Sequence, residues 1–169
     1  SIIRVFEQTR FMASRHGANC TKILKRKLMD AWKQPGDVMV FGYTAEEADR
    51  LEDFRDRNPD RPVLAPLVDA GLGKEDCKAM IERAGIELPL MYRLGYDNAN
   101  CIGCVKGGRG YWNRIRKDFP EVFAQRAAME REIGGTCIKG VYLDELDPRA
   151  GRHSGEIMDD CGIFCEMMR

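Results

Sequence analysis

The stretch over residues 37–58 constrains the fold more than any other part of the chain. Residues 37–43, DVMVFGY, form a short, almost continuously apolar run, which predicts a buried strand ending near Gly42. Thr44 and Glu47 follow with the spacing of a capping box, which predicts that a helix begins there. A strand, a tight turn and a helix in this order form one unit of an α/β fold.

The other segments extend this pattern. Residues 61–69 predict a second short strand or an extended segment. Amphipathic helices are predicted over 20–32, 73–85, 111–119 and 120–135. Residues 136–169 form an irregular, glycine-rich and cysteine-containing tail. We therefore expect a single α/β domain over 1–169 with a helical, cysteine-bearing C-terminal part.

Three of these helices carry apolar faces that can be checked by burial. The predicted faces are Leu24, Leu28 and Ala31 in the first helix, and Cys77, Met80, Ile81 and Ala84 in the second. In the helix over 120–135, the shared face is Val122, Arg126, Met129 and Ile133, and Gly134 is predicted to end the helix.

The overall composition excludes several classes of protein. Basic and acidic residues number 27 each, so net charge gives no general attraction to nucleic acid or to an anionic membrane. No apolar run approaches the roughly 20 residues needed to cross a bilayer. The first ten residues, SIIRVFEQTR, lack the apolar region of a signal peptide. These features predict a cytoplasmic protein without a membrane partner.

Seven cysteines are many for 169 residues, and clustered cytosolic cysteines favour metal or redox chemistry over disulfides. Cys77 and Cys137 have apolar surroundings, and we expect both to be small core residues. Cys101 and Cys104 differ from them because they form the motif CIGC. Two thiolates at this spacing can hold one metal ion or one corner of a cluster.

Two other interpretations of CIGC remain open: a thioredoxin-like redox pair and a plain structural turn. The redox pair is less favoured because the polar stretch GYDNAN, rather than a strand, precedes the motif. Further ligands would come from Cys20, which opens a predicted helix, and from Cys161 or Cys165 in the tail. An all-cysteine site suits zinc and an iron–sulfur cluster equally.

A basic, aromatic segment follows CIGC. Its cations are Lys106, Arg109, Arg114, Arg116 and Lys117. They form either a solvated helix face or a positive rim that receives phosphate or a nucleic-acid backbone. Tyr111 and Trp112 could stack on a base or pack against the core.

The arrangement CTKILK, 80 intervening residues and CIGC resembles the sulfonucleotide reductases, the phosphoadenosine and adenosine phosphosulfate (PAPS) reductase family. The resemblance implies a partial Rossmann-like, adenine nucleotide α-hydrolase-like sheet flanked by helices. It also implies a [4Fe–4S] cluster held by Cys20, Cys101 and Cys104, with Lys25 beside it and Cys161 or Cys165 as fourth ligand. By similarity of FGYTAEEADR, the nucleotide pocket would be lined by Gly42, Glu47 and Arg50.

The tail DDCGIF resembles the family segment whose cysteine attacks the substrate sulfur, which implies Cys161 as the nucleophile and Cys165 as the ligand. This chain also departs from the family. The phosphate-binding loop is not found, Thr21 replaces the second cysteine of the pair, Thr44 and Ala45 stand where arginines are usual, and Phe164 replaces a histidine.

These features predict an iron–sulfur enzyme that reduces a sulfonucleotide to sulfite with a thiol reductant such as thioredoxin. One alternative is a nucleotide-dependent sulfurtransferase that modifies nucleic acid. Another is a non-catalytic binding module with structural zinc. An adenine nucleotide is the expected substrate or co-substrate of either enzyme.

Overall fold

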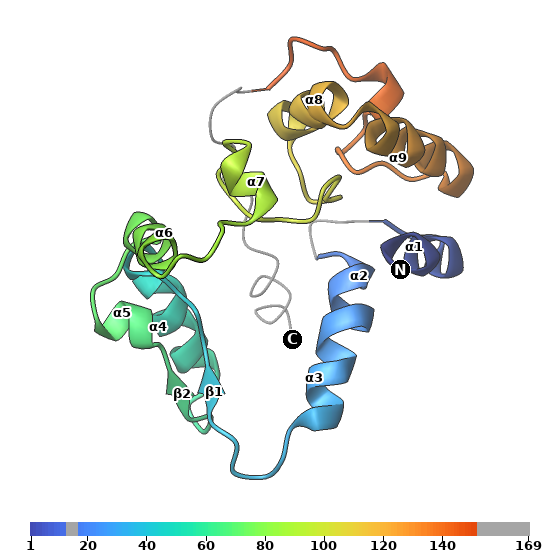
Figure 1. Cartoon of the computed structure of the whole chain (residues 1–169). Coiled ribbons are helices and arrows are strands. Elements are labelled where there is room, and N and C mark those ends of the chain that lie inside the picture. The colour runs from blue at the N-terminus through green and yellow to red at the C-terminus, as the bar shows by residue number, and fades with distance from the viewer. Residues whose placement is uncertain (13–16, 152–169) are drawn as a thin grey trace. The chain divides into compact units, whose positions relative to one another are not determined.

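The computed structural model describes residues 1–12 and 17–151, which form two compact units (Figure 1). The first, here called the cysteine unit, comprises Ser1–Ala31 and the chain from Leu90 onward. The second, here called the strand unit, is Trp32–Pro89. Each unit is described by itself below.

The strand unit contains a small parallel sheet of two strands, β1 (Met39–Val40) and β2 (Val63–Leu64). Met39 pairs with Val63 and Val40 with Leu64. Between the strands the chain forms the 3-10 turn η2 (Ala45–Glu47) and helix α4 (Ala48–Arg57). Helices α5 (Pro66–Asp69) and α6 (Lys74–Arg83) follow β2. The chain is therefore a helix-rich α/β protein, as the sequence predicts, with a parallel sheet of two short strands.

The capping box predicted at Thr44 and Glu47 is confirmed. The Thr44 backbone N–H donates to the Glu47 carboxylate at 3.2 Å, and the helix begins at this point. The core beside it is formed by Tyr43, Leu51, Phe54 and Ala65, which are all buried. The ring of Phe41 packs edge-on against Phe54, with ring centroids 4.8 Å apart.

Two burial predictions in the strand unit are wrong. The first strand is not buried, because Val40 is 64% exposed and its partner Leu64 is 54% exposed. Successive strand residues point to opposite faces of a sheet. The paired residues Val40 and Leu64 are on the exposed face of this sheet. In α6 no residue is buried: Cys77 and Ile81 are half-buried, while Met80 and Ala84 are exposed.

The cysteine unit begins with helix α1 (Ile2–Thr9), whose Val5 and Phe6 are buried. The predicted helix over 20–32 is present as α2 (Asn19–Thr21), a π-helical turn over Lys22–Arg26 and α3 (Lys27–Trp32). Its predicted apolar face is largely exposed, although α2 packs against α1. Leu28, for example, is 62% exposed.

The rest of this unit is built on a helical hairpin. The short helix α7 (Leu90–Arg93) precedes α8 (Arg109–Asp118) and α9 (Pro120–Ile133), which pack against each other. Both predicted helices are thus confirmed, and Gly134 ends α9 with a φ of 76°. The core of the hairpin consists of Trp112, Ile115, Phe123, Ala127, Leu143 and Leu146 together with Met91, Tyr96 and Tyr111.

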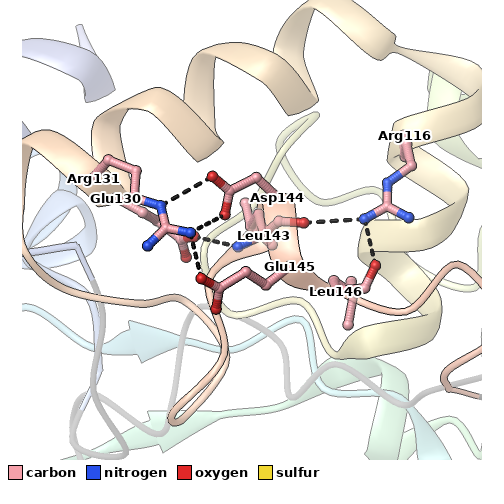
Figure 2. Close-up of polar contacts among 7 residues, drawn as sticks. All are labelled: Arg116, Glu130, Arg131, Leu143, Asp144, Glu145 and Leu146. Carbon is pink, nitrogen blue, oxygen red and sulfur yellow. Dashed lines mark hydrogen bonds and ion pairs between the residues drawn. The ribbon is translucent and has the colours of Figure 1, made fainter.

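The segment after α9 is fastened to the hairpin by backbone-directed side chains (Figure 2). The carboxylate of Glu130, which is fully buried, accepts hydrogen bonds from the backbone N–H groups of Cys137 and Leu143. Arg116 on α8 donates to the carbonyl oxygens of Leu143 and Leu146 at 3.0 and 2.8 Å. These bonds hold the 3-10 turn η3 (Leu143–Glu145) on both helices.

Exposed charges add to this attachment. Arg131 binds the carboxylates of Asp144 and Glu145 at 2.8 and 2.6 Å, as Figure 2 shows. Its guanidinium also lies 3.8 Å from the centroid of the Tyr142 ring. Residues 136–151, the described part of the predicted irregular tail, are therefore ordered by contacts with α8 and α9 even though they form little regular structure.

Candidate metal centre

A pocket of about 170 Å³ in the cysteine unit contains three of the predicted metal ligands in its wall. Cys20 comes from α2, and Cys101 and Cys104 come from the CIGC turn, which follows Cys20 after 80 intervening residues. Lys25, on the π-helical turn after Cys20, lines the same pocket. Much of the remaining wall is apolar and includes Ile2, Phe6, Leu24 and Val105.

Cys20 reaches the pocket because it is the second residue of a helix that begins at Asn19, one residue before the predicted start. Its neighbour Thr21 is buried. Cys20 itself packs against the apolar cluster of Val5, Phe6 and Met129. Its position is therefore set by the packing of α2 on α1.

The CIGC turn is shaped by Gly103, whose φ of 70° lies in the left-handed region that favours glycine. A side chain at this position would also be obstructed, because an added Cβ would lie 2.5 Å from Cγ1 of Val122 on α9. The backbone of the turn therefore lies directly on the helical hairpin, and Cys101 and Cys104 flank the point of contact.

The two cysteines are also joined through the hydroxyl of Tyr111 on α8. This oxygen accepts a hydrogen bond from the Cys104 backbone N–H and donates one to the Cys101 carbonyl, both at 2.9 Å. Burial raises the pKa of Tyr111 well above its usual value, so the hydroxyl keeps the proton that it donates. The Tyr111 hydroxyl therefore links the two ends of the turn.

Arg126 places a buried cation behind the turn. The residue is only 6% exposed, and its Nε donates to the Gly103 carbonyl at 3.4 Å. Burial lowers the pKa of its guanidinium. Negative charge on nearby groups acts in the opposite direction and raises this pKa; these groups are Cys137, Tyr111, Cys101 and Cys104. The sequence contains a signal for this residue, because Arg126 is the one charged side chain on a predicted helix face that otherwise consists of Val122, Met129 and Ile133.

The predicted ligands share a pocket but do not form a closed metal site. Cys101 is exposed, and Cys20 and Cys104 are half-buried. Across residues 1–12 and 17–151, no three His, Cys, Asp or Glu side chains are grouped so as to hold a metal ion. The thiol donors suit zinc or an iron–sulfur cluster in their chemistry. Cys161 and Cys165, predicted as nucleophile and further ligand, lie outside the described residues.

The two cysteines expected to be core residues are placed differently. Cys137 packs against both apolar clusters of the cysteine unit, as predicted. Burial, and next the carboxylate of Glu130, raise the pKa of its thiol. Cys77 lies in the strand unit and is only half-buried.

The predicted nucleotide-lining residues Gly42, Glu47 and Arg50 all belong to the strand unit. Both carboxylate oxygens of Glu47 are engaged, one by Thr44 and one by an ion pair with Arg50. Arg50 Nη2 is buried and has no hydrogen-bond partner among the described residues. Gly42 is exposed, and an added Cβ there would meet no atom within 4 Å.

Part of the basic segment after CIGC is used for packing, whereas Arg109 and Lys117 are exposed. Trp112 is fully buried and Tyr111 is 8% exposed, so neither ring can stack on a base, and that interpretation is wrong. Arg114 donates to the carbonyl oxygens of Leu94 and Gly95, and its guanidinium covers the Tyr96 ring at 3.9 Å.

Comparison with protein-family models, with curated proteins and with solved structures finds no match. Among the described residues, the structure contains no helix of the length and apolar character that a membrane crossing requires.

Proposed function

We propose that this chain is an iron–sulfur protein in which Cys20, Cys101, Cys104 and Cys165 hold a [4Fe–4S] cluster. One observation carries the proposal: cysteines from two segments separated by 80 residues line a single pocket. A cluster takes four cysteine thiolates, and the pocket walls supply three of them. Zinc is the alternative occupant, since it binds the same donors.

The charges around the pocket favour an occupant that is negative overall. Arg126 is buried, and its hydrogen bonds within residues 1–12 and 17–151 go to neutral oxygens, those of Gly103 and Gln125. A buried cation is costly unless an opposite charge offsets it. Thiolates at Cys101 and Cys104 would supply that charge, and Lys25 would add a second cation at the pocket wall.

The proposed reaction is the reduction of a sulfonucleotide to sulfite. The Cys161 thiolate attacks the sulfur, a bond between Sγ and this sulfur forms, and the nucleotide phosphate leaves with the electron pair of the broken sulfur–oxygen bond. A dithiol reductant such as thioredoxin then attacks Sγ and releases sulfite, and its second thiol regenerates Cys161. The cluster would adjust the charge near the sulfate, together with Lys25.

The nucleotide would bind the strand unit, as part of a Rossmann-like sheet. Nη2 of Arg50 supports this, because it has no hydrogen-bond partner in the part of the chain that the structure describes and can still donate to an anionic group. Gly42 supports it as well, since its surface leaves room for a ligand to approach the backbone. Glu47 would act indirectly, by orienting Arg50 through their ion pair.

A nucleotide-dependent sulfurtransferase acting on nucleic acid is the second candidate. The observation that favours it is the use of Thr44 and Ala45 at the start of η2, where sulfate-binding arginines would be expected. Thr44 is committed to the capping box and cannot bind sulfate in the same way. A non-catalytic zinc module remains a third candidate.

Sulfite release from adenosine phosphosulfate and from phosphoadenosine phosphosulfate, with thioredoxin as reductant, tests the leading function. We expect release by the wild type, its loss in Cys161→Ser and its retention in Cys77→Ser, the matched control. Thiolation of transfer RNA without sulfite release would establish the sulfurtransferase instead. A protein that contains zinc and performs neither reaction would be the binding module.

A further inference from the structure

We propose that Tyr111 is the positioning residue of the CIGC turn, and that its hydroxyl sets the spacing of Cys101 and Cys104 for a thiophilic metal centre. This inference deepens the proposed function and rests on it. The hydroxyl lies between the Cys101 carbonyl and the Cys104 N–H and bonds to both at 2.9 Å.

These two backbone groups are the ones that bond directly to each other in a closed β-turn. Gly103, with its positive φ, occupies the third position of such a turn. In this protein the Tyr111 oxygen links the carbonyl and the amide, so a side chain from α8 becomes part of the turn. The separation of the two cysteine backbones therefore depends on where α8 holds that oxygen.

The ring that carries the hydroxyl is fixed on several sides. It packs edge-on against Tyr96 and Trp112, with centroid distances of 6.0 and 5.6 Å. Gly107 provides the space that the ring occupies, because an added Cβ there would lie 2.0 Å from the ring. The hydroxyl is therefore pre-organised, and little conformational freedom is lost when a metal binds beside it.

Outer groups that orient metal ligands have a known scale of effect, about 10- to 100-fold in metal affinity when they are removed. Tyr111→Phe keeps the ring and deletes only the oxygen that joins the cysteines. Tyr96→Phe is the matched control, because it deletes a neighbouring phenol oxygen that bonds to Asp118 at 2.8 Å, away from the turn.

The test titrates the full, metal-free chain with Co²⁺ under anaerobic conditions and follows the thiolate-to-cobalt absorption. We expect Tyr111→Phe to bind Co²⁺ at least about 10-fold more weakly than wild type. Tyr96→Phe should stay within about 2-fold of wild type. Equal weakening in both variants, or a wild-type affinity in Tyr111→Phe, would overturn the inference, because a merely structural role would not separate the two tyrosines.

A second measurement separates this inference from the proposed function. Amide hydrogen exchange of Cys104, measured without metal, should become at least about 10-fold faster in Tyr111→Phe, because its acceptor is gone. It should not change in Tyr96→Phe. If the wild type binds no Co²⁺, the proposed metal centre is wrong. If the exchange rate of the Cys104 amide is unchanged in Tyr111→Phe, Tyr111 does not hold the turn, whether or not Co²⁺ binds.

Discussion

Gly103 offers the sharpest test of how the cysteine turn is built, because two separate costs act on a side chain there. Gly103→Ala would place an alanine at a φ of 70°, which costs about 1–2 kcal/mol of folding free energy. The new Cβ would also lie 2.5 Å from Cγ1 of Val122, and overpacking of this kind costs about 1–3 kcal/mol. We therefore expect a total loss of about 2–5 kcal/mol.

Two further variants separate these costs. Gly134→Ala introduces a similar φ, 76°, at a position where an added Cβ meets nothing within 4 Å, so it should cost only the backbone term. Val122→Ala removes the obstructing methyl groups from the half-buried partner. In the double variant Gly103→Ala/Val122→Ala, the coupling free energy should be favourable by at least about 1 kcal/mol.

Urea unfolding followed by tryptophan fluorescence provides the free energies. Trp112 is fully buried in the cysteine unit, whereas Trp32 is 84% exposed, so a Trp32→Phe background leaves a single reporter for this unit. If Gly103→Ala costs no more than Gly134→Ala, or if the coupling with Val122 is within about 0.3–0.5 kcal/mol of zero, the turn does not lie against α9 as described.

The remaining predictions concern other contacts of the same unit, each measured by urea unfolding. Glu130→Gln should cost about 2–4 kcal/mol, because one of the two N–H groups loses a charged acceptor. A cost as small as that of Arg131→Ala, which removes only exposed ion pairs to Asp144 and Glu145, would contradict the attachment of the tail. The pKa of the Cys137 thiol is raised on folding, so the folded state keeps this proton at alkaline pH where the unfolded state loses it. The free energy of unfolding therefore has its full value below about pH 8.5 and decreases above it. Cys137→Ala should make that fall shallower by up to about 1.4 kcal/mol per pH unit, and an identical slope would refute the burial of the thiol. Gly107→Ala should destabilise the unit by about 1–3 kcal/mol by displacing the Tyr111 ring, and a Cys104 amide that exchanges at the wild-type rate in this variant would show that the ring keeps its place.

Local sequence signals predicted the parts of the fold that depend on short-range chemistry. The Thr44–Glu47 capping box and the Gly134 helix end were both predictable, because each depends on a few adjacent residues. The exposure of Val40 and Leu28 was not, because periodicity shows which residues share a face and not whether another element covers it.

The candidate site also has some features that the sequence indicated and others that depend on tertiary contacts. The cysteine spacing indicated that Cys20, Cys101 and Cys104 act together, and they line one pocket. The role of Tyr111 depends on how α8 folds back over the turn, so its sequence position seven residues after Cys104 carries no signal for it. Arg126 did carry a signal, as a cation on an apolar helix face, but its nearness to the cysteines required the structure.

The account depends most directly on what occupies the cysteine pocket. The measurement is iron, acid-labile sulfide and zinc per chain after anaerobic purification and reconstitution, with the absorption spectrum. We expect about four iron and four sulfide per chain in the wild type and in Cys77→Ser, and loss of both in Cys20→Ser, Cys101→Ser and Cys104→Ser. A colourless protein with one zinc and no iron, or a cluster that survives all three of these substitutions, would contradict the account.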